Sequence, residues 1–453
     1  MVKKGRHKKK KVNNVVHLIQ TNAAGIDVGA TEIYIAVPDD RDSRSVRKFE
    51  TFTEDLHKAA KWLKSCSIES IAMESTGVYW IPVYQILDSY GFDVVLVNAR
   101  HVKNVPGRKT DVQDCQWLQY LHSVGLLAGS FRPAQEICAV RSLLRHRGNL
   151  IKMSAAHIQH MQKALTQMNV QIHHVISDIT GLTGMAIVDA ILAGERNPQK
   201  LASLKDRRIK ADNSIIEKSL EGDFRPEHLF ALKQALQAYR NYREMISECD
   251  REIESHLNAL DSRVDPEENP PPPPTSKRKK PQGNEPDFDL RSQLYRILGT
   301  DLTQVDGISV ITAHVFLAEV GPDMSRFPTA NNFCSWLCLC PNNKITGGKV
   351  LSSHTRKSGN RLAQTLRMAA EGLWNSRSCL GEYLRRMRAR LGAPKAITAT
   401  AHKLARIIYH LITTGKQFDE TVFAHQEELH RKRLERRIRN QAKVLGFQLI
   451  TSQ

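Results

Sequence analysis

Gly25-Ile26-Asp27-Val28-Gly29-Ala30-Thr31-Glu32-Ile33-Tyr34-Ile35-Ala36-Val37 is the stretch that decides the fold. It predicts two short strands joined by a hairpin that contains a glycine. The first strand is apolar apart from one acid, Asp27. A carboxylate on a buried strand costs free energy unless its charge is paired or binds a metal. The stretch therefore raises the question whether other acids converge on Asp27.

Three further acids follow in chain order. Glu74 closes the apolar run Ile71-Ala72-Met73, and Asp111 and Asp114 are three residues apart, so that on a helix they share one face. Two Mg²⁺ ions held about 3.5–4 Å apart require oxygen ligands from several chain segments. A single acid at a strand end is most often only exposed to solvent. Four acids in this order, with strands and helices between them, predict a site for two-metal phosphodiester chemistry.

Strand and helix patterns alternate around these acids. The sequence predicts strands at 23–29, 32–38, 46–52, 69–74 and 93–98, and helices at 54–65, 79–90 and 111–124. Thr53 is predicted to cap the first helix, and Gly91 to end the second. Hairpin-connected strands followed by strand–helix–strand predict an α/β RNase H-like (RuvC-like) domain.

The charge balance points to a polyanionic partner. The chain has 453 residues with 66 Lys and Arg against 47 Asp and Glu, a net charge of +19, which favours nucleic acid, either DNA or RNA. No signal peptide and no apolar span of about 18 residues is found, so a cytoplasmic protein without a membrane partner is expected. The 8 cysteines form no C-x-x-C pair, and Cys334-x-x-x-Cys338-x-Cys340 is expected to be reduced core thiols.

Composition divides the chain into six segments. They are a basic disordered arm (1–20), the RuvC-like domain with the four acids (21–130), a helical coiled-coil region (131–262), a Pro-rich basic linker with Pro270–Pro274 (263–290), a mostly α-helical C-terminal domain (291–415) and a basic C-terminal helix (416–453). Two long amphipathic helices, at 134–170 and 226–260, predict an antiparallel coiled-coil arm. The basic run Arg431–Arg439 is either a stripe that faces phosphates or a solvated helix face.

Two segments of the C-terminal domain have features suited to nucleic-acid chemistry. Leu302–Gly321 is similar to half of a helix-hairpin-helix, which offers backbone N–H groups to a phosphate. In Pro341–Ser353, the hydroxyl of Thr346 precedes a Gly-Gly turn with lysines on both sides; this suits a nucleophile that attacks a phosphodiester, although composition alone favours an ordinary polar hairpin. The basic residues expected to contact nucleic acid are Arg108, Lys109, Lys344, Lys349, Arg356, Lys357 and Arg361.

Together these motifs resemble the DEDD transposases of the "one-ten" insertion-sequence family, including its "eleven-eleven" branch. In the first half the resemblance lies in Gly-Ile-Asp27-Val-Gly, Met-Glu74-Ser-Thr-Gly-Val-Tyr79 and Lys-Thr-Asp111-x-x-Asp114. In the second half it lies in Val305-Asp-Gly-Ile-Ser-x-x-Thr-Ala, Asn343-Lys-Ile-Thr346-Gly-Gly-Lys-Val and Ala-His402-Lys-Leu-Ala-Arg406. The resemblance runs from about residue 21 to 415 and keeps the family order.

The resemblance implies a recombinase of a bacterial mobile element, associated with the nucleoid. It implies acids that bind Mg²⁺, an element-encoded guide RNA, DNA ends and target as substrates, and a homo-oligomer (dimer or tetramer) with shared active sites. The family's serine, which forms a covalent 5′-phospho link to DNA, aligns with Thr346; Ser352 and Ser353 are the other candidates. The extra methyl group of threonine crowds the approach to phosphorus.

Three other functions are open at this level. A RuvC-like structure-specific endonuclease would use the same acids with water as the nucleophile. A sugar-kinase or actin-like ATPase also begins with a strand, an Asp and a Gly, but its second phosphate loop is not found here, and a charge of +19 fits it poorly. A non-catalytic nucleic-acid-binding protein would bind no Mg²⁺.

Overall fold

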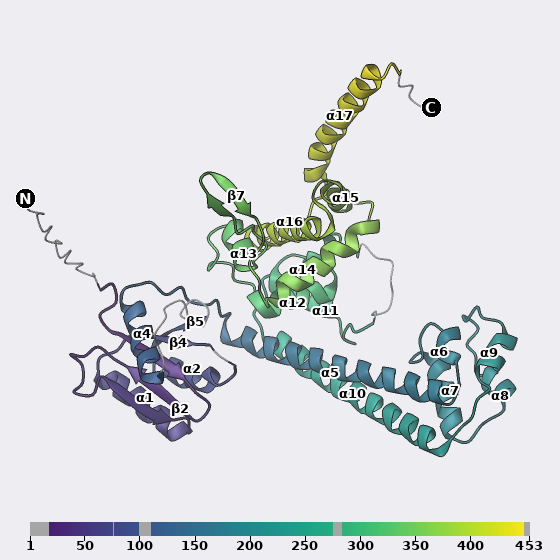
Figure 1. Cartoon of the computed structure of the whole chain (residues 1–453), viewed down its shortest axis with the longest axis horizontal. Coiled ribbons are helices and arrows are strands. Elements are labelled where there is room, and N and C mark those ends of the chain that lie inside the picture. The colour runs from purple at the N-terminus through teal and green to yellow at the C-terminus, as the bar shows by residue number, and fades with distance from the viewer. Residues whose placement is uncertain (1–17, 76, 99–109, 275–282, 448–453) are drawn as a thin grey trace, which may run out of the picture. The chain divides into compact units, whose positions relative to one another are not determined.

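The computed structural model describes residues 18–75, 77–98, 110–274 and 283–447. The chain divides into two compact units, residues 1–132 and 133–453. Most of the predicted basic arm, the basic loop that contains Arg108 and Lys109, and the run Lys277–Lys280 lie outside the described residues. Figure 1 shows the elements in chain order.

The first unit is built on a five-stranded mixed sheet. Its strands are β1 (Ala23–Val28), β2 (Glu32–Ala36), β3 (Val46–Glu50), β4 (Ser70–Glu74) and β5 (Asp93–Val97). They lie in the order β3-β2-β1-β4-β5. β1, β2 and β3 pair antiparallel, whereas β4 is parallel to β1 and β5 is parallel to β4. The predicted mixed α/β architecture is confirmed, with each strand within two residues of its predicted bounds.

Helices cover both faces of this sheet. On one face α1 (Thr53–Ser65) and α2 (Trp80–Ser89) enclose a core that includes Ile26, Ile71 and Met73. On the other face lies α4 (Asp111–Ser123), where the Gln119 amide donates to the Ala23 carbonyl over 3.3 Å. Because strand side chains alternate, residues 25 and 27 of β1 point to the α4 side.

The start of α1 corrects one prediction. The N–H groups of Asp55 and Leu56 both donate to the carbonyl of Phe52, so the helix begins one residue earlier than predicted. Phe52 is the extended residue before the helix, and no side chain caps it, so the prediction that Thr53 is the N-cap is wrong. The predicted stop at Gly91 is confirmed, since that residue has a φ of 73° and donates to Asp88.

Gly25 allows α4 to lie directly on β1. A Cβ built at position 25 would be 2.3 Å from the Cys115 carbonyl oxygen and 2.3 Å from the Gln119 nitrogen. Both atoms belong to the α4 backbone, so a side-chain rotation cannot relieve the clash. The lack of a side chain here sets how closely the backbone of α4 packs on β1.

We expect Gly25→Ala to lower the free energy of unfolding of the first unit by about 1–3 kcal/mol or more, because the added methyl group overpacks a backbone contact. Gly148→Ala, in the second unit, is the control for a Gly-to-Ala change without a clash, because a Cβ there meets no atom within 4 Å and the residue lies inside a helix. That control should gain about 0.5–1 kcal/mol. Denaturant unfolding measures both, and a Gly25→Ala protein as stable as the wild type would contradict the close approach.

The second unit begins with two long antiparallel helices, α5 (Gln135–Gln167) and α10 (Pro226–Asn258), which pack side by side (Figure 1). Four short helices lie between them in sequence and join their core around Met161, Leu165 and Leu232. They are α6 (Ile172–Val175), α7 (Leu182–Leu192), α8 (Pro198–Ala202) and α9 (Asn213–Ser219). The two long helices match the predicted bounds, while their supercoiling into a coiled coil stays a prediction.

The rest of the second unit is mostly helical, as predicted. It contains α11 (Leu290–Leu298), η1 (Leu302–Gln304), α12 (Val310–Val320), α13 (Ala330–Trp336), α14 (Arg361–Gly372), η2 (Leu373–Asn375), α15 (Cys379–Leu391), α16 (Ala393–Thr414) and α17 (Thr421–Val444). A two-stranded hairpin, β6 (Lys344–Thr346) and β7 (Lys349–Ser352), stands between α13 and α14. Phe316 and Phe333 are fully buried in this core.

Buried charge and a buried imidazole lie where α5 meets its neighbours. Arg147 forms a bidentate ion pair with Asp250 of α10, both side chains being less than a tenth exposed. His314 of α12 is fully buried, and within the described residues neither of its ring nitrogens has a hydrogen-bond partner. Burial, followed by the positive charge of Arg147, lowers the pKa of His314 to about 3.

His314 therefore predicts an acid-sensitive second unit. The folded chain holds a neutral imidazole while the unfolded chain binds a proton below its ordinary pKa of 6.5. Stability should fall by roughly 1.4 kcal/mol for each pH unit between about 6.5 and the folded pKa. Denaturant unfolding at several pH values measures this slope. The His314→Leu variant should lose that part of the slope, and an identical pH dependence in both proteins would contradict the assignment.

Candidate active site

Asp27 and Glu74 stand at the carboxyl ends of two neighbouring parallel strands. The register pairs Ile26 with Met73, so Asp27 and Glu74 are the next residue on each strand. Ile26 and Met73 are fully buried on the α1 and α2 face. Since side chains alternate, Asp27 and Glu74 point to the opposite face, which α4 covers. The sheet thus places two of the predicted acids side by side.

Asp111 and Asp114 stand in the first turn of α4. Thr110 caps this helix, because its side chain accepts a hydrogen bond of 3.3 Å from the Gln113 N–H. The contact of Gly25 with Cys115 and Gln119 fixes the helix on β1, so its first turn lies toward the Asp27 end of that strand. The positive end of the helix dipole stabilises carboxylates at this position.

The electrostatics of Asp27 indicate that the other three acids lie near it. Burial and, in decreasing order of size, the charges of Asp111, Asp114 and Glu74 together raise the pKa of Asp27 to about 6. A hydrogen bond from the Val28 backbone acts in the opposite direction. Three carboxylates from two other chain segments, β4 and α4, therefore act on one half-buried carboxylate of β1.

The four carboxylates are the type of ligand that suits a hard divalent cation, although their side chains do not surround a common point. Carboxylate oxygens are the ligands that Mg²⁺ prefers, and mutual repulsion at Asp27 is what a bound cation would relieve. Among the residues that the structure describes, no group of three or more His, Cys, Asp or Glu side chains is placed so that it could hold a metal ion. The roles of Asp27, Glu74, Asp111 and Asp114 as ligands remain a prediction.

Sequence reasoning missed the immediate neighbours of Asp27. Tyr34 pairs with Asp27 across β1 and β2, and its hydroxyl donates to Glu32 over 3.0 Å. Cys115 lies fully buried in α4, and burial together with the charge of Asp27 raises the pKa of its thiol to about 12. This thiol is therefore protonated at neutral pH and is no nucleophile. Cross-strand pairing within 25–37 was the signal that could have identified Tyr34.

Thr346 lies in the second unit, at the end of β6. It pairs with Lys349 of β7 across a two-residue turn, where Gly347 and Gly348 have φ values of 50° and 75°. Positive φ at both positions is the geometry that favours a tight hairpin and requires glycine there. Thr346, Lys344 and Lys349 are all exposed. The hairpin therefore presents a hydroxyl and two ammonium groups to solvent.

The other predicted basic residues have varied surroundings. Arg356 donates to the carbonyl of Ser335 over 2.7 Å, which ties the segment between β7 and α14 to α13. Lys357 is exposed, and Arg361 is the first residue of α14, which Asn360 caps. Arg108 and Lys109 lie outside the described residues. Contacts of all seven with nucleic acid remain a prediction.

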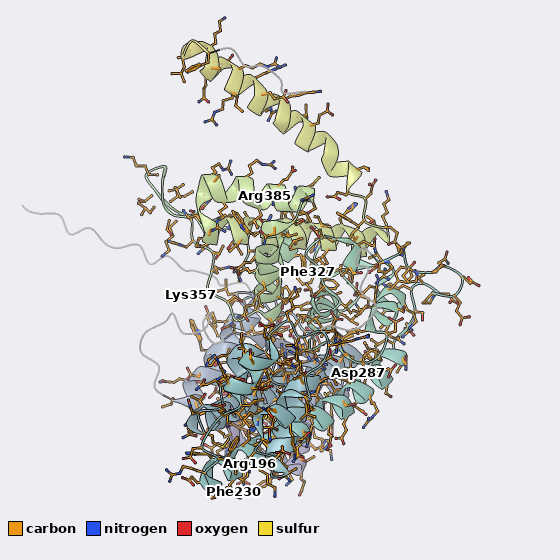
Figure 2. All side chains as sticks on the ribbon, turned by 90° about the vertical axis from the view of Figure 1, so that its right-hand side faces the viewer. Arg196, Phe230, Asp287, Phe327, Lys357 and Arg385 are labelled. Atoms are coloured by element: carbon orange, nitrogen blue, oxygen red, sulfur yellow. The ribbon has the colours of Figure 1, made fainter. Side chains whose placement is uncertain are left out.

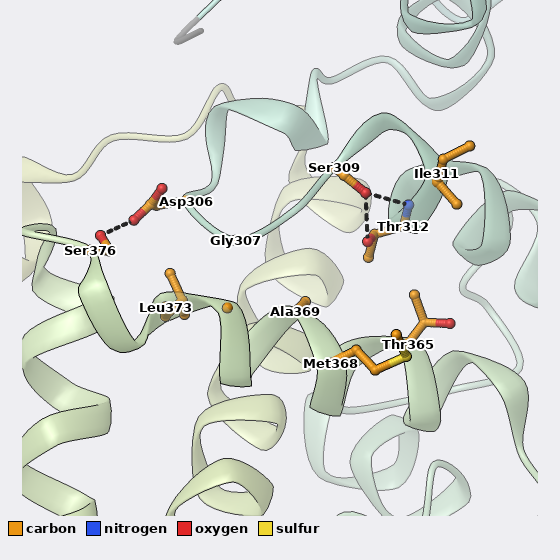
Figure 3. A pocket seen from close by; sticks show the side chains of 11 residues that line it. Asp306, Gly307, Ser309, Ile311, Thr312, Thr365, Met368, Ala369, Leu373 and Ser376 are labelled. Atoms are coloured by element: carbon orange, nitrogen blue, oxygen red, sulfur yellow. Dashed lines mark hydrogen bonds between the residues drawn. The ribbon is translucent and has the colours of Figure 1, made fainter. Parts of the chain in front are cut away.

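The segment similar to a helix-hairpin-helix forms one wall of a cavity of about 390 Å³ (Figure 3). Asp306 accepts hydrogen bonds from Ser376 and, over 2.6 Å, from Ser378. Ser309 caps α12 by accepting from the Thr312 N–H over 3.1 Å. One N–H at this helix start is thus already bonded within the protein, and binding of a phosphate here remains a prediction.

Comparison with known proteins gives the class of the chain. A family model of DEDD transposases, described as "Transposase", matches residues 24–170, which hold the sheet, the four acids and α5. A second model, described as "Transposase IS116/IS110/IS902 family", matches residues 299–384, which hold the β6–β7 hairpin. Both matches are to transposases, and together they cover about half of the chain. The chain belongs to the IS116/IS110/IS902 family of transposases.

Two curated relatives agree with this. The "Insertion element IS110 uncharacterized 43.6 kDa protein" of Streptomyces coelicolor is 30% identical over 131 residues, covering 28% of this chain and 31% of the relative. The "Putative transposase y4pF/y4sB" of Sinorhizobium fredii is 31% identical over 127 residues, covering 26% of this chain and 32% of the relative. The chain thus matches about a third of the length of either relative. None of the described helices is long and apolar enough to cross a membrane.

Proposed function

We propose that this protein is a DNA transposase that cleaves and rejoins DNA strands with the help of divalent metal ions, Mg²⁺ in particular. The observation that carries the proposal is the electrostatic convergence of Glu74, Asp111 and Asp114 on the half-buried Asp27. Four carboxylates from three elements would hold the cations, which when bound polarise the scissile phosphate and stabilise the leaving oxygen.

The sheet supports an RNase H-like, RuvC-like assignment of the first unit. Along the chain, the antiparallel strands β1, β2 and β3 are followed by β4, α2 and β5, which is the order of elements from which the sequence predicts that fold. Acids at the carboxyl ends of two central strands, and on a helix packed over them, are where such a domain would carry its chemistry.

Thr346 is the proposed nucleophile. Its hydroxyl oxygen would attack phosphorus, so that a bond from Oγ1 to phosphorus forms while the bond from phosphorus to the DNA 3′-oxygen breaks. The hydroxyl proton leaves to solvent, and the departing 3′-oxygen takes up a proton. The product is a 5′-phospho link between protein and DNA. Lys349, directly opposite Thr346, would neutralise the phosphate, as would the exposed Lys344.

Family membership supports the remaining parts of the proposal. They are guidance by an element-encoded RNA, DNA ends and target as substrates, and a homo-oligomer in which the paired helices α5 and α10 act as a coiled-coil arm. The net charge of +19 suits a protein that holds both DNA and RNA. The five described basic residues Lys344, Lys349, Arg356, Lys357 and Arg361, with Arg108 and Lys109, are proposed to contact these strands.

A reconstituted reaction tests the proposal. The full chain, a DNA carrying the element end, the transcript of the element's non-coding flank and Mg²⁺ should yield cleaved strands and a protein–DNA adduct on denaturing gels. Cleaved DNA without any adduct would favour the RuvC-like endonuclease, which uses water. No cleavage and no Mg²⁺ binding would favour a binding protein without catalysis.

A further inference from the structure

The last helix, α17, carries its basic residues as a stripe. At 100° per residue, Lys432, Arg436, Arg439 and Lys443 fall within an arc of about 60° on one side of the helix. All four side chains are exposed, and Lys432 forms an exposed ion pair of 2.7 Å with Glu428, one turn earlier in the helix. Ile438 and Leu445, which are also exposed, lie on the opposite side. Figure 2 shows the described α17 side chains as sticks around the helix.

This helix lies outside both regions that match the transposase family, which end at residue 384. Its start is held by α15, where the Cys379 N–H donates to the Glu420 carboxylate over 2.9 Å. Beyond that point the described side chains of residues 432–440 are exposed throughout. Over residues 432–440 the described side chains thus make little apolar contact, and they are accessible to a partner.

The charge of the stripe selects the partner. Residues 431–443 contain seven basic side chains and one acidic side chain, Glu435. The four stripe residues span about 17 Å along the helix axis. Each strand of a duplex carries one phosphate charge for every 3.4 Å or so of the duplex axis, so a row of this length is long enough to face more than one phosphate. The basic row and a phosphodiester strand are thus opposite in charge.

We propose that α17 is a nucleic-acid-binding arm whose stripe Lys432, Arg436, Arg439 and Lys443 lies along a phosphodiester backbone. The choice of a nucleic acid over another polyanion rests on the proposed transposase function. The stripe reads no base, so it holds DNA or RNA independently of sequence and leaves target choice to other parts of the complex.

Two double variants of the full chain distinguish an effect of the stripe on binding from an effect of net charge alone. Arg436→Gln with Arg439→Gln removes two charges on the stripe, whereas Arg433→Gln with Arg437→Gln removes two charges from the neighbouring side of the same helix. Glutamine and arginine have nearly equal helix propensity, so both variants keep the helix, which circular dichroism checks. Fluorescence anisotropy with a labelled DNA duplex and a labelled RNA hairpin, over a range of salt concentrations, gives the affinities.

The on-stripe variant should bind one or both probes about tenfold more weakly, with a salt slope smaller by about 1.8, while the off-stripe control stays near the wild type. The probe for which the affinity of the on-stripe variant falls shows whether the stripe binds DNA or RNA. Equal losses in both variants, or none in either, would overturn the proposal. The proposal would also be overturned if the on-stripe variant bound phosphatidylserine vesicles more weakly than the wild type but kept its affinity for both nucleic-acid probes. None of these binding measurements depends on the four acids, so an inactive site would leave this test intact.

Discussion

Asp27→Asn is expected to abolish Mg²⁺-dependent strand cleavage and, in the same protein, to stabilise the metal-free fold. Asparagine keeps the shape of the side chain but removes the charge on which Glu74, Asp111 and Asp114 converge. Loss of one ligand from a two-metal site removes several kcal/mol of transition-state stabilisation, so the rate should fall by at least about a hundredfold.

The gain in stability has the same origin. A pKa of Asp27 raised to about 6 means that the folded chain resists its ionisation at neutral pH. A neutral side chain removes that cost, and the free energy of unfolding should rise by about 1–2 kcal/mol, a figure reduced for the solvent that reaches a half-buried group. Opposite changes in activity and stability distinguish a functional carboxylate from a structural one.

Asp40→Asn is the control for this experiment. Asp40 lies in the loop after β2 and is largely exposed, so its loss should change neither the rate nor the stability beyond about 0.5 kcal/mol. Titration calorimetry with Mg²⁺ adds a direct readout, in which Asp27→Asn should weaken binding and Asp40→Asn should not. Strand cleavage that survives Asp27→Asn unchanged would remove the acids from the mechanism.

Thr346→Ala should eliminate the covalent protein–DNA adduct, while Thr346→Ser should keep it. Alanine has no oxygen with which to attack phosphorus, so the loss should be complete on a suicide substrate that traps the intermediate. Serine lacks the methyl group that restricts threonine and crowds its approach. We therefore expect the serine variant to form the adduct at least as fast as the wild type.

Ser352→Ala and Ser353→Ala complete the series for the hairpin. Ser352 is the last residue of β7 and pairs with Lys344, so it is near Thr346 without sharing its place at the turn. Each serine variant should retain the adduct. An adduct that persists in Thr346→Ala and disappears in one of these variants would transfer the nucleophile to that serine.

The sequence indicated the first unit well because its signals are local. Alternation in residues 25–37 and the acids at strand ends were sufficient to predict the strands, and Asp111 and Asp114 indeed open α4. What the sequence could not give is the approach of α4 to β1, which depends on a contact between Gly25 and residues about 90 positions later. The misplaced N-cap at Thr53 has a similar cause, since the backbone bonds to Phe52 decide it.

The hairpin of Thr346 shows a different limit. Two glycines predict a tight turn, and the structure has one with both φ values positive. Nothing in residues 341–353 reveals which surface the exposed hydroxyl meets, because its proposed partner is a DNA strand rather than another part of the core. The pattern of apolar residues in a sequence predicts which side chains are buried. It does not predict which exposed residue reacts with a substrate.

Gly25 has a consequence for how this protein can evolve. The atoms that a larger residue would strike belong to the main chain of α4, and every amino acid has those atoms. Trimming a neighbouring side chain therefore cannot make room, and a genetic selection for revertants of Gly25→Ala should return true reversions and no second-site suppressors at positions 115 or 119. In a scan of all single substitutions, Gly25 should therefore accept as few replacements as Asp27, although a glycine has no side-chain functional group.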